Sequence, residues 1–104
     1  MSFIVVYITH PDMTTARRIA SHLLEKRIIV CANFIPITSI YWWEGKIEDT
    51  CEVVSIVKTR KENWPRLKAE VEKTHPYKVP CIMKLTAEAN KKFEDWIRSE
   101  TKKP

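Results

Sequence analysis

Apolar and polar positions follow two different spacings along the first part of the chain. Residues 3–8 form a continuous apolar and β-branched run, which predicts a central strand buried on both faces. Residues 16–24 instead place apolar side chains three and four positions apart, a spacing typical of one helical face. Asp12 precedes this segment and Lys26 follows it, as expected for an N-cap residue and for a cation near a helix C-terminus. A strand followed by a helix is therefore predicted.

Two strand-like runs occupy the middle of the chain. Residues 28–43 are strand-like almost throughout and are interrupted by Pro36, whose missing N–H marks an edge, a bend or a bulge. Residues 51–59 return as the partner strand. Between the two runs lies Gly45, the only glycine of the chain, which reaches positive φ without steric cost and predicts a tight turn. We therefore expect a long hairpin formed by the second and third strands.

The remaining sequence predicts two more helices and one more strand. Asn63 begins a helix that ends before Pro76, residues 81–85 form a strand, and Asn90 caps a last helix. The resulting order, β-α-β-β-α-β followed by a helix, is that of the ferredoxin-like sandwich. We therefore predict an α+β fold in a single domain over residues 1–104, with an extra C-terminal helix.

The length of the hairpin has a consequence for assembly. Residues 28–43 would extend about 50 Å at about 3.3 Å per residue, whereas a domain of this size has a radius of gyration near 13 Å. Right-handed crossovers place both main helices on one face of the sheet and leave the other face bare. The hairpin should therefore protrude or bend at Pro36 and expose the aromatic residues 41–43, an aggregation hazard in a free monomer. We predict a closed oligomer of identical chains.

Composition and charge narrow the class of protein. The chain has 104 residues, 44% of them hydrophobic and 30% charged, as expected for a folded globular protein. Its net charge of +5 comes from interspersed basic and acidic residues, which favours a solvated surface over a nucleic-acid interface. Cys31, Cys51 and Cys81 are odd in number and widely spaced, which indicates unpaired thiols in a reducing, cytoplasmic compartment. The N-terminal apolar run is too short for a signal core or a membrane span, so no membrane partner is expected.

Several functions known for ferredoxin-like domains are excluded by the residues. An RNA-recognition domain would stack bases on aromatic side chains of its third strand, and residues 52–57 contain none. A copper chaperone of this topology would carry C-x-x-C after the first strand, where residues 9–13 contain no cysteine. An acylphosphatase would need a glycine-rich phosphate loop, and this chain has a single glycine. No nucleophile is paired with a base at a recognisable spacing, so we expect no catalytic residues and no enzymatic activity.

A set of motifs occurs in a fixed order along nearly the whole chain. They are Cys31-Ala32-Asn33, Pro36, Tyr41-Trp42-Trp43-Glu44-Gly45-Lys46-Ile47-Glu48, Lys58-Thr59-Arg60, His75-Pro76-Tyr77-Lys78-Val79-Pro80 and Asp95-Trp96-Ile97. Together they closely resemble the CutA family, the divalent-cation tolerance proteins. The resemblance implies a ferredoxin-like protomer in a tightly packed homotrimer similar to the PII signalling proteins, with β-pairing and clefts between protomers. It also implies a role in the response to divalent metals such as copper.

The resemblance also points to candidate metal ligands. Some bacterial members carry, as copper ligands, a cysteine late in the first strand and two adjacent histidines before Pro-Tyr. The matching positions here are Ile8, Thr74 and His75, so only His75 is kept. Cys31 is a second candidate ligand for Cu²⁺ or another divalent cation, although buried packing is the favoured interpretation. Cys81 stands where many members have glutamate, and would offer a softer ligand.

A cleft between protomers is the expected binding site, for a metal ion or a small anionic ligand. Its expected lining is Tyr41, Trp42, Glu44, Lys58, His75 and Tyr77, a convergent polar set inside an aromatic wall. The expected trimer interface is Ile40, Tyr41, Trp42, Trp43 and Trp96.

Simpler roles for these residues stay open. Trp42 and Trp43 are better explained as interface core than as a ligand platform. Lys58 is a candidate to pair with Glu44 across strands, and His75 to bond a backbone carbonyl. His10 and His22 are expected on the surface without partners. A PII-like sensor of a small anionic metabolite and a non-catalytic trimeric scaffold for a partner protein are the alternative functions.

Overall fold

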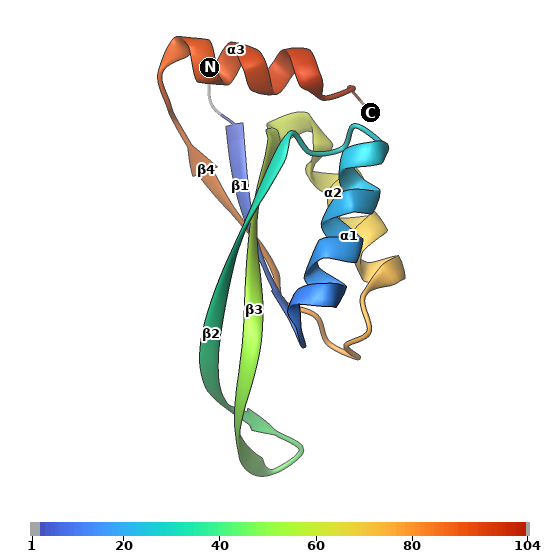
Figure 1. The fold of residues 1–104 in the computed structure, drawn as a ribbon, viewed down its shortest axis with the longest axis vertical. Coiled ribbons are helices and arrows are strands. Elements are labelled where there is room, and N and C mark those ends of the chain that lie inside the picture. Colours follow the sequence, from blue (N-terminus) through green and yellow to red (C-terminus); the bar gives the residue numbers. More distant parts are fainter. Residues whose placement is uncertain (1–2, 104) are drawn as a thin grey trace.

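The computed structural model describes residues 3–103 and follows the predicted order of elements (Figure 1). The elements are β1 (Phe3–His10), α1 (Met13–Glu25), β2 (Cys31–Trp43), β3 (Lys46–Arg60), the short 3₁₀ helix η1 (Lys61–Asn63), α2 (Trp64–Thr74), β4 (Ile82–Ala87) and α3 (Lys91–Glu100). The strands form one antiparallel sheet in the order β2-β3-β1-β4. The α+β, ferredoxin-like prediction is confirmed.

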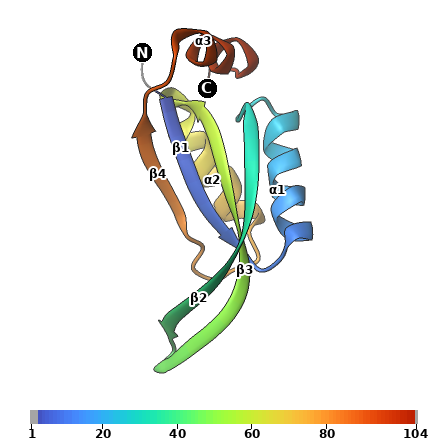
Figure 2. The ribbon, with the colours of Figure 1, turned by 60° about the vertical axis from the view of Figure 1, so that its left-hand side comes forward.

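Helices α1 and α2 lie on one side of the sheet (Figure 2). The core between them contains Ile4, Val6 and Ile8 of β1, together with Ile19 and Leu23 of α1 and Leu67 and Val71 of α2. The intervening side chains of β1 point to the other face and are only half-buried. The prediction that β1 is buried on both faces therefore holds only for the face that the helices cover.

The turn before α1 follows the sequence prediction. The Asp12 carboxylate accepts a hydrogen bond from the Thr15 N–H at 2.7 Å and caps the helix. The other end differs from the expected strand, because Ile28, Ile29 and Val30 are buried but lie between α1 and β2. Arg27, with φ of 59°, turns the chain out of α1. Two bonds tie the connection to β3: the Val30 N–H donates to the Lys58 carbonyl, and the Ile28 carbonyl accepts from the Thr59 hydroxyl. A buried connection and a strand have the same apolar pattern, which explains the error.

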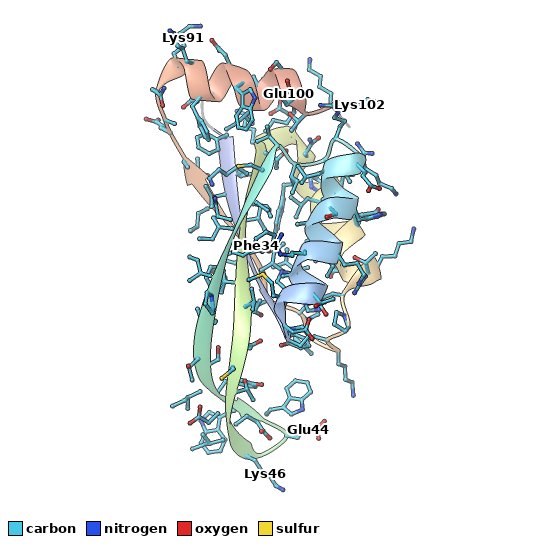
Figure 3. The ribbon with its side chains drawn as sticks, viewed as in Figure 1. Phe34, Glu44, Lys46, Lys91, Glu100 and Lys102 are labelled. Carbon is cyan, nitrogen blue, oxygen red and sulfur yellow. The ribbon has the colours of Figure 1, made fainter. Side chains whose placement is uncertain are left out.

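The hairpin of β2 and β3 extends well beyond the rest of the sheet, and we call its outer part, residues 36–52, the arm. Strand β1 pairs with β3 only over Val53–Arg60, whereas β2 stays paired with β3 to its end. The molecule measures 45 × 25 × 21 Å. Glu44 and Gly45, with φ of 49° and 78°, form the tight turn (Figure 3). The predicted protrusion is confirmed, and Pro36 lies in an edge strand.

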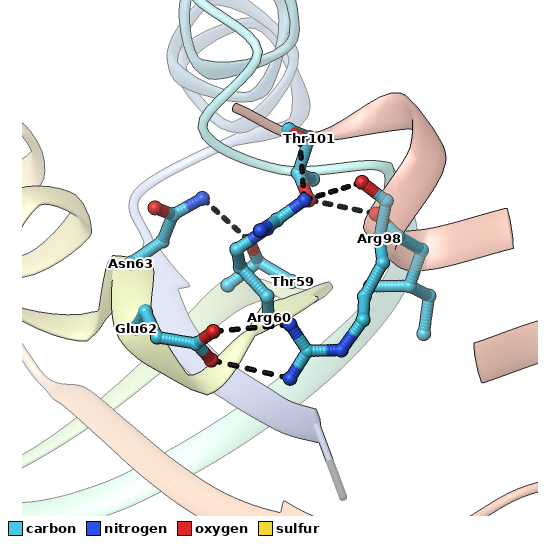
Figure 4. Close-up of polar contacts among 7 residues, drawn as sticks. Thr59, Arg60, Glu62, Asn63, Arg98 and Thr101 are labelled. Carbon is cyan, nitrogen blue, oxygen red and sulfur yellow. Dashed lines mark hydrogen bonds and ion pairs between the residues drawn. The ribbon is translucent and has the colours of Figure 1, made fainter. Parts of the chain in front are cut away.

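Helix α3 lies across the end of the sheet and is held there by Arg60 (Figure 4). The buried guanidinium donates to the Thr101 hydroxyl and carbonyl, both at 2.9 Å, and to the Arg98 carbonyl. Arg98 in turn pairs with Glu62 at 3.0 Å. A cation at a helix C-terminus is favoured by the helix dipole, so Arg60 fixes α3 to the end of β3.

Candidate functional site

Polar side chains cluster where the connection between α2 and β4 reaches the base of the arm. The Tyr77 hydroxyl donates to Glu52 Oε2 at 2.6 Å. The Tyr77 N–H donates to His75 Nδ1 at 3.1 Å, and the two rings lie 4.8 Å apart. Burial and the nearby Glu52 carboxylate raise the pKa of Tyr77, which keeps its hydroxyl protonated as a donor. The hydrogen bond from Tyr77 to Glu52 thereby ties the α2–β4 connection to β3.

Both ring nitrogens of His75 are engaged. His75 Nε2 lies 2.7 Å from the Thr9 carbonyl oxygen, which can only accept, so Nε2 carries the proton. Nδ1 is then the acceptor for the Tyr77 N–H. Burial lowers the pKa of His75, in agreement with a neutral ring. A metal ion at His75 would have to displace one of these two bonds.

His10 stacks on His75 inside the protein. The ring centroids are 5.3 Å apart, and His10 Nε2 shares a hydrogen bond of 2.8 Å with Ser55 Oγ. The His10 side chain is fully buried, and its Nδ1 has no hydrogen-bond partner among the described residues. Burial, with a smaller contribution from His75, lowers the pKa of His10 to about 4.

The expectation that His10 and His22 are surface residues without partners is wrong. Strand β1 continues two residues past its predicted end, so His10 follows Ile4, Val6 and Ile8 on the face that the helices cover. His22 is partly exposed but contacts Glu70 of α2 at 2.6 Å, across the two helices.

An aromatic hollow of about 260 Å³ lies beside this polar group. Tyr41 and Trp43 line it from the arm, and Tyr77 and Val79 line it from the α2–β4 connection. Tyr41 and Trp43 share a face of β2 because side chains alternate along a strand. Tyr41 also accepts a long hydrogen bond of 3.4 Å from the Thr50 hydroxyl. Three of the predicted cleft residues, Tyr41, His75 and Tyr77, are thus brought together within one protomer.

The other three predicted cleft residues lie elsewhere. Trp42 points to the opposite face of the arm, opposite Ile47, and 72% of it is exposed. Glu44 lies in the turn at the tip of the arm (Figure 3). Lys58 lies opposite Cys31 at the far end of β3, where its ammonium group donates to Asn33 Oδ1. Lys58 and the tip are roughly 40 Å apart along the strand, so no Glu44–Lys58 pair forms within the protomer.

The two candidate metal ligands are also apart. Cys31 packs against the small cluster of Phe3, Val30 and Ile97, as the packing interpretation expects. It lies at the end of the sheet away from His75, whose ring contacts Thr9. Among residues 3–103, no group of three or more histidine, cysteine or acidic side chains is placed to hold a metal ion.

An open groove of about 510 Å³ lies on the other side of Glu52. It runs between the start of α1 and the base of the arm, and its lining is Pro11, Asp12, Met13, Pro36, Ile37, Thr38, Cys51, Glu52 and Val53. The thiol of Cys51 is exposed there, and Asp12 is already occupied as the cap of α1. Glu52 thus lines the groove and also accepts the hydrogen bond of Tyr77, which lines the aromatic hollow.

The sequence analysis missed Glu52, His10 and Ser55. Glu52 carried a usable signal, because an acidic residue next to the apolar run of β3 is costly to bury without a partner. His10 and Ser55 had no such signal, since their contact depends on the register that places His10 opposite Val53.

Apolar side chains remain exposed on the arm and on the uncovered sheet face. On the arm they are Ile40, Tyr41, Trp42, Trp43 and Ile47, and on the sheet they are Ile35, Met83 and Leu85. Trp96 of α3 is 42% exposed, so it does not belong to the buried side of that helix. All five predicted interface residues are thus on the surface of the protomer. None of the helices in the described part of the chain is long and apolar enough to cross a membrane.

Known proteins are similar to this chain in both sequence and fold. Residues 4–100 match the family model of the CutA1 divalent ion tolerance protein. The divalent-cation tolerance protein CutA of Pyrococcus horikoshii is 43% identical over 101 residues, covering 96% of this chain and 99% of the relative.

Two solved structures show the same similarity. CutA from Archaeoglobus fulgidus, described as a periplasmic divalent cation tolerance protein, has a TM-score of 0.90 at 44% identity, covering 96% of this chain and 98% of that one. CutA1 from Oryza sativa has a TM-score of 0.95 at 33% identity, covering 100% of this chain and 97% of that one. With the matching fold, these findings show that the chain belongs to the CutA1 family of divalent ion tolerance proteins.

Proposed function

We propose that the chain works as a homotrimeric, non-catalytic divalent-cation tolerance protein. The observation that carries the trimer is the apolar surface left on the arm and the uncovered sheet face, which a monomer would expose to water. Strand β2 adds a 13-residue edge whose outward backbone groups are available for pairing with another chain. Arms of neighbouring copies would cover both. The family resemblance favours three copies over two.

The trimer is tested by charging the arm. Trp42→Asp places a carboxylate on the exposed apolar arm, and we expect it to lower the mass in solution toward that of the protomer. Leu24→Asp, on the exposed side of α1, is the matched control and should keep the mass of the unaltered protein. An unchanged mass for Trp42→Asp would count against the arm as an interface.

We propose that the trimer binds divalent metal ions of the copper type weakly, in clefts between protomers. One protomer has no cluster of three ligands among its described residues, so a site would draw ligands from two chains. His75 is the proposed histidine ligand. Its Nδ1 lone pair is held by the Tyr77 N–H, so a metal must first displace that bond, which explains low affinity.

Calorimetric titration of metal-free protein with Cu²⁺ and Zn²⁺ tests the metal proposal. We expect His75→Ala to reduce uptake, and His22→Ala, which alters a histidine between α1 and α2, to leave it unchanged. No uptake above background would overturn metal binding and leave the trimeric scaffold as the better account.

We propose a cytoplasmic location and no catalytic step. Exposed thiols at Cys51 and Cys81 favour a reducing compartment. Ser55 and His10 contact each other, but both are sealed from solvent, so the pair has no access to a substrate. Fractionation of the source cells would test the location, and recovery in a periplasmic or secreted fraction would contradict it.

A further inference from the structure

The arm is the acidic part of an otherwise basic chain. It contains four acidic side chains and one basic side chain, a net charge of −3, whereas the whole chain carries +5. Glu52 is buried and bonded to Tyr77, which leaves Glu44, Glu48 and Asp49 on the outer half of the arm. None of these three forms an ion pair with another described residue. The arm therefore presents carboxylates that the protomer itself does not neutralise.

The uncovered sheet face carries an ammonium group without a counter-charge. Lys58 lies opposite Val5, which in turn lies opposite Leu85, so the lysine shares the face of these apolar side chains. Its ammonium group donates to the neutral amide oxygen of Asn33, and Lys58 forms no ion pair among the described residues. Arg60 shares the face, but its guanidinium is held by α3.

Covering this face with a second chain would take the Lys58 ammonium group out of water. A desolvated cation is unfavourable unless an opposite charge comes with the partner. The protomer has no acidic side chain in contact with Lys58, whereas a second copy brings the unpaired carboxylates of its arm. Charge complementarity thus selects the same occupant for the sheet face as the exposed apolar surface does.

We propose that the arm of a second copy docks on the uncovered sheet face and places a carboxylate, from Glu44, Glu48 or Asp49, against Lys58. The inference rests on the proposed trimer and adds the contact that fixes how the copies meet. Three such contacts, each from the arm of one copy to Lys58 of the next, close a ring. A charge pair inside an apolar interface also specifies register, because any other alignment leaves the ammonium group unpaired.

Charge reversal tests the contact through the mass in solution. Lys58→Glu should shift the protein from the trimer toward the protomer at micromolar concentration, because two negative charges then meet. Lys73→Glu makes the same change at an exposed position of α2 and is the matched control, which should stay trimeric. In the Lys58→Glu protein, Glu44→Lys, Glu48→Lys and Asp49→Lys are then added one at a time, and the reversal at the pairing carboxylate should restore the trimer. A trimeric mass for Lys58→Glu, or no restoration by any of the three, would overturn the inference.

Salt dependence gives a second measurement that does not rely on charge reversal. Lys58→Gln keeps a hydrogen-bond donor at this position and removes only the charge, so it is the milder variant. Raising NaCl from about 50 to about 500 mM should weaken association of the unaltered protein about tenfold, since salt screens attraction between charges. Lys58→Gln should lose most of this dependence, because its remaining contacts are apolar. Equal salt dependence of the two proteins would contradict the charge pair.

The outcome for Lys58 is distinguishable from the outcome for the trimer. A mass of one protomer for the unaltered chain would overturn the trimer and the Lys58 contact together. A trimer that Lys58→Glu leaves intact would overturn the Lys58 contact alone.

Discussion

Lowering the pH should destabilise this fold through His10. The ring is fully buried, shares a hydrogen bond with Ser55 and stacks on His75. A second proton would place a charge beside the neutral His75 ring, and Nδ1 would then donate with no acceptor in reach among the described residues. The positive charge of nearby Arg18 also opposes protonation of His10. The Glu52 carboxylate favours protonation, but its effect is smaller than the opposing effect of burial.

The size and sign of the effect follow from the pKa. Burial lowers the pKa of His10 from 6.5 to about 4, so the unfolded chain binds the proton more tightly than the folded chain. The stabilisation is complete above pH 6.5 and is lost as the pH falls toward 4. Because one pKa unit corresponds to about 1.36 kcal/mol, the loss at pH 4 is about 3 kcal/mol per protomer.

The assay is guanidinium unfolding followed by tryptophan fluorescence, at pH 7 and pH 4 and at one protein concentration. His10→Gln is the variant, because the glutamine amide can replace Nε2 as the partner of Ser55 without titrating. We expect the unaltered protein to lose about 3 kcal/mol more than the variant between the two pH values.

Two results would show that burial does not lower the pKa of His10 as described. One is a difference between the unaltered protein and His10→Gln of under about 1 kcal/mol, which is less than one pKa unit. The other is an NMR titration in which folded His10 shows a pKa at or above its ordinary value of 6.5.

Two further predictions concern the ends of the hairpin. Arg60→Met should destabilise the protein by about 2 kcal/mol, because it leaves the Arg98 and Thr101 carbonyls without their charged donor; hydrogen exchange should rise first in α3, and unchanged exchange there would show that Arg60 does not hold the helix. Gly45→Ala should cost about 1 kcal/mol, since φ is +78° while an added Cβ meets no atom within 4 Å. Gly45→Asn is the reference, because asparagine tolerates positive φ, and a drop in melting temperature far larger for Gly45→Ala than for Gly45→Asn would indicate a clash instead.

The order of elements could be predicted because each element buries one face. The spacing of Ile19, Ala20 and Leu23 specifies a helix whatever lies opposite, and the single glycine marks the turn of the hairpin. The length of the arm followed in the same way from the length of the strand-like runs. These features depend on local spacing, which the sequence displays directly.

The candidate site could be predicted only in part. Tyr41, His75 and Tyr77 were expected together, but Trp42 was placed with them although alternation along β2 turns it to the other face. The contact of Tyr77 with Glu52 depends on how the α2–β4 connection passes the end of β1. No local spacing encodes that path, because it is set by the packing of α2 on the sheet.

The mass of the unaltered chain in solution tests the proposed trimer most directly. The arm and the uncovered sheet face are explained here as surfaces that sister chains cover. Light scattering at micromolar concentration should therefore give the mass of three protomers of 12.3 kDa, about 37 kDa. A stable mass of 12.3 kDa under the same conditions would contradict the account.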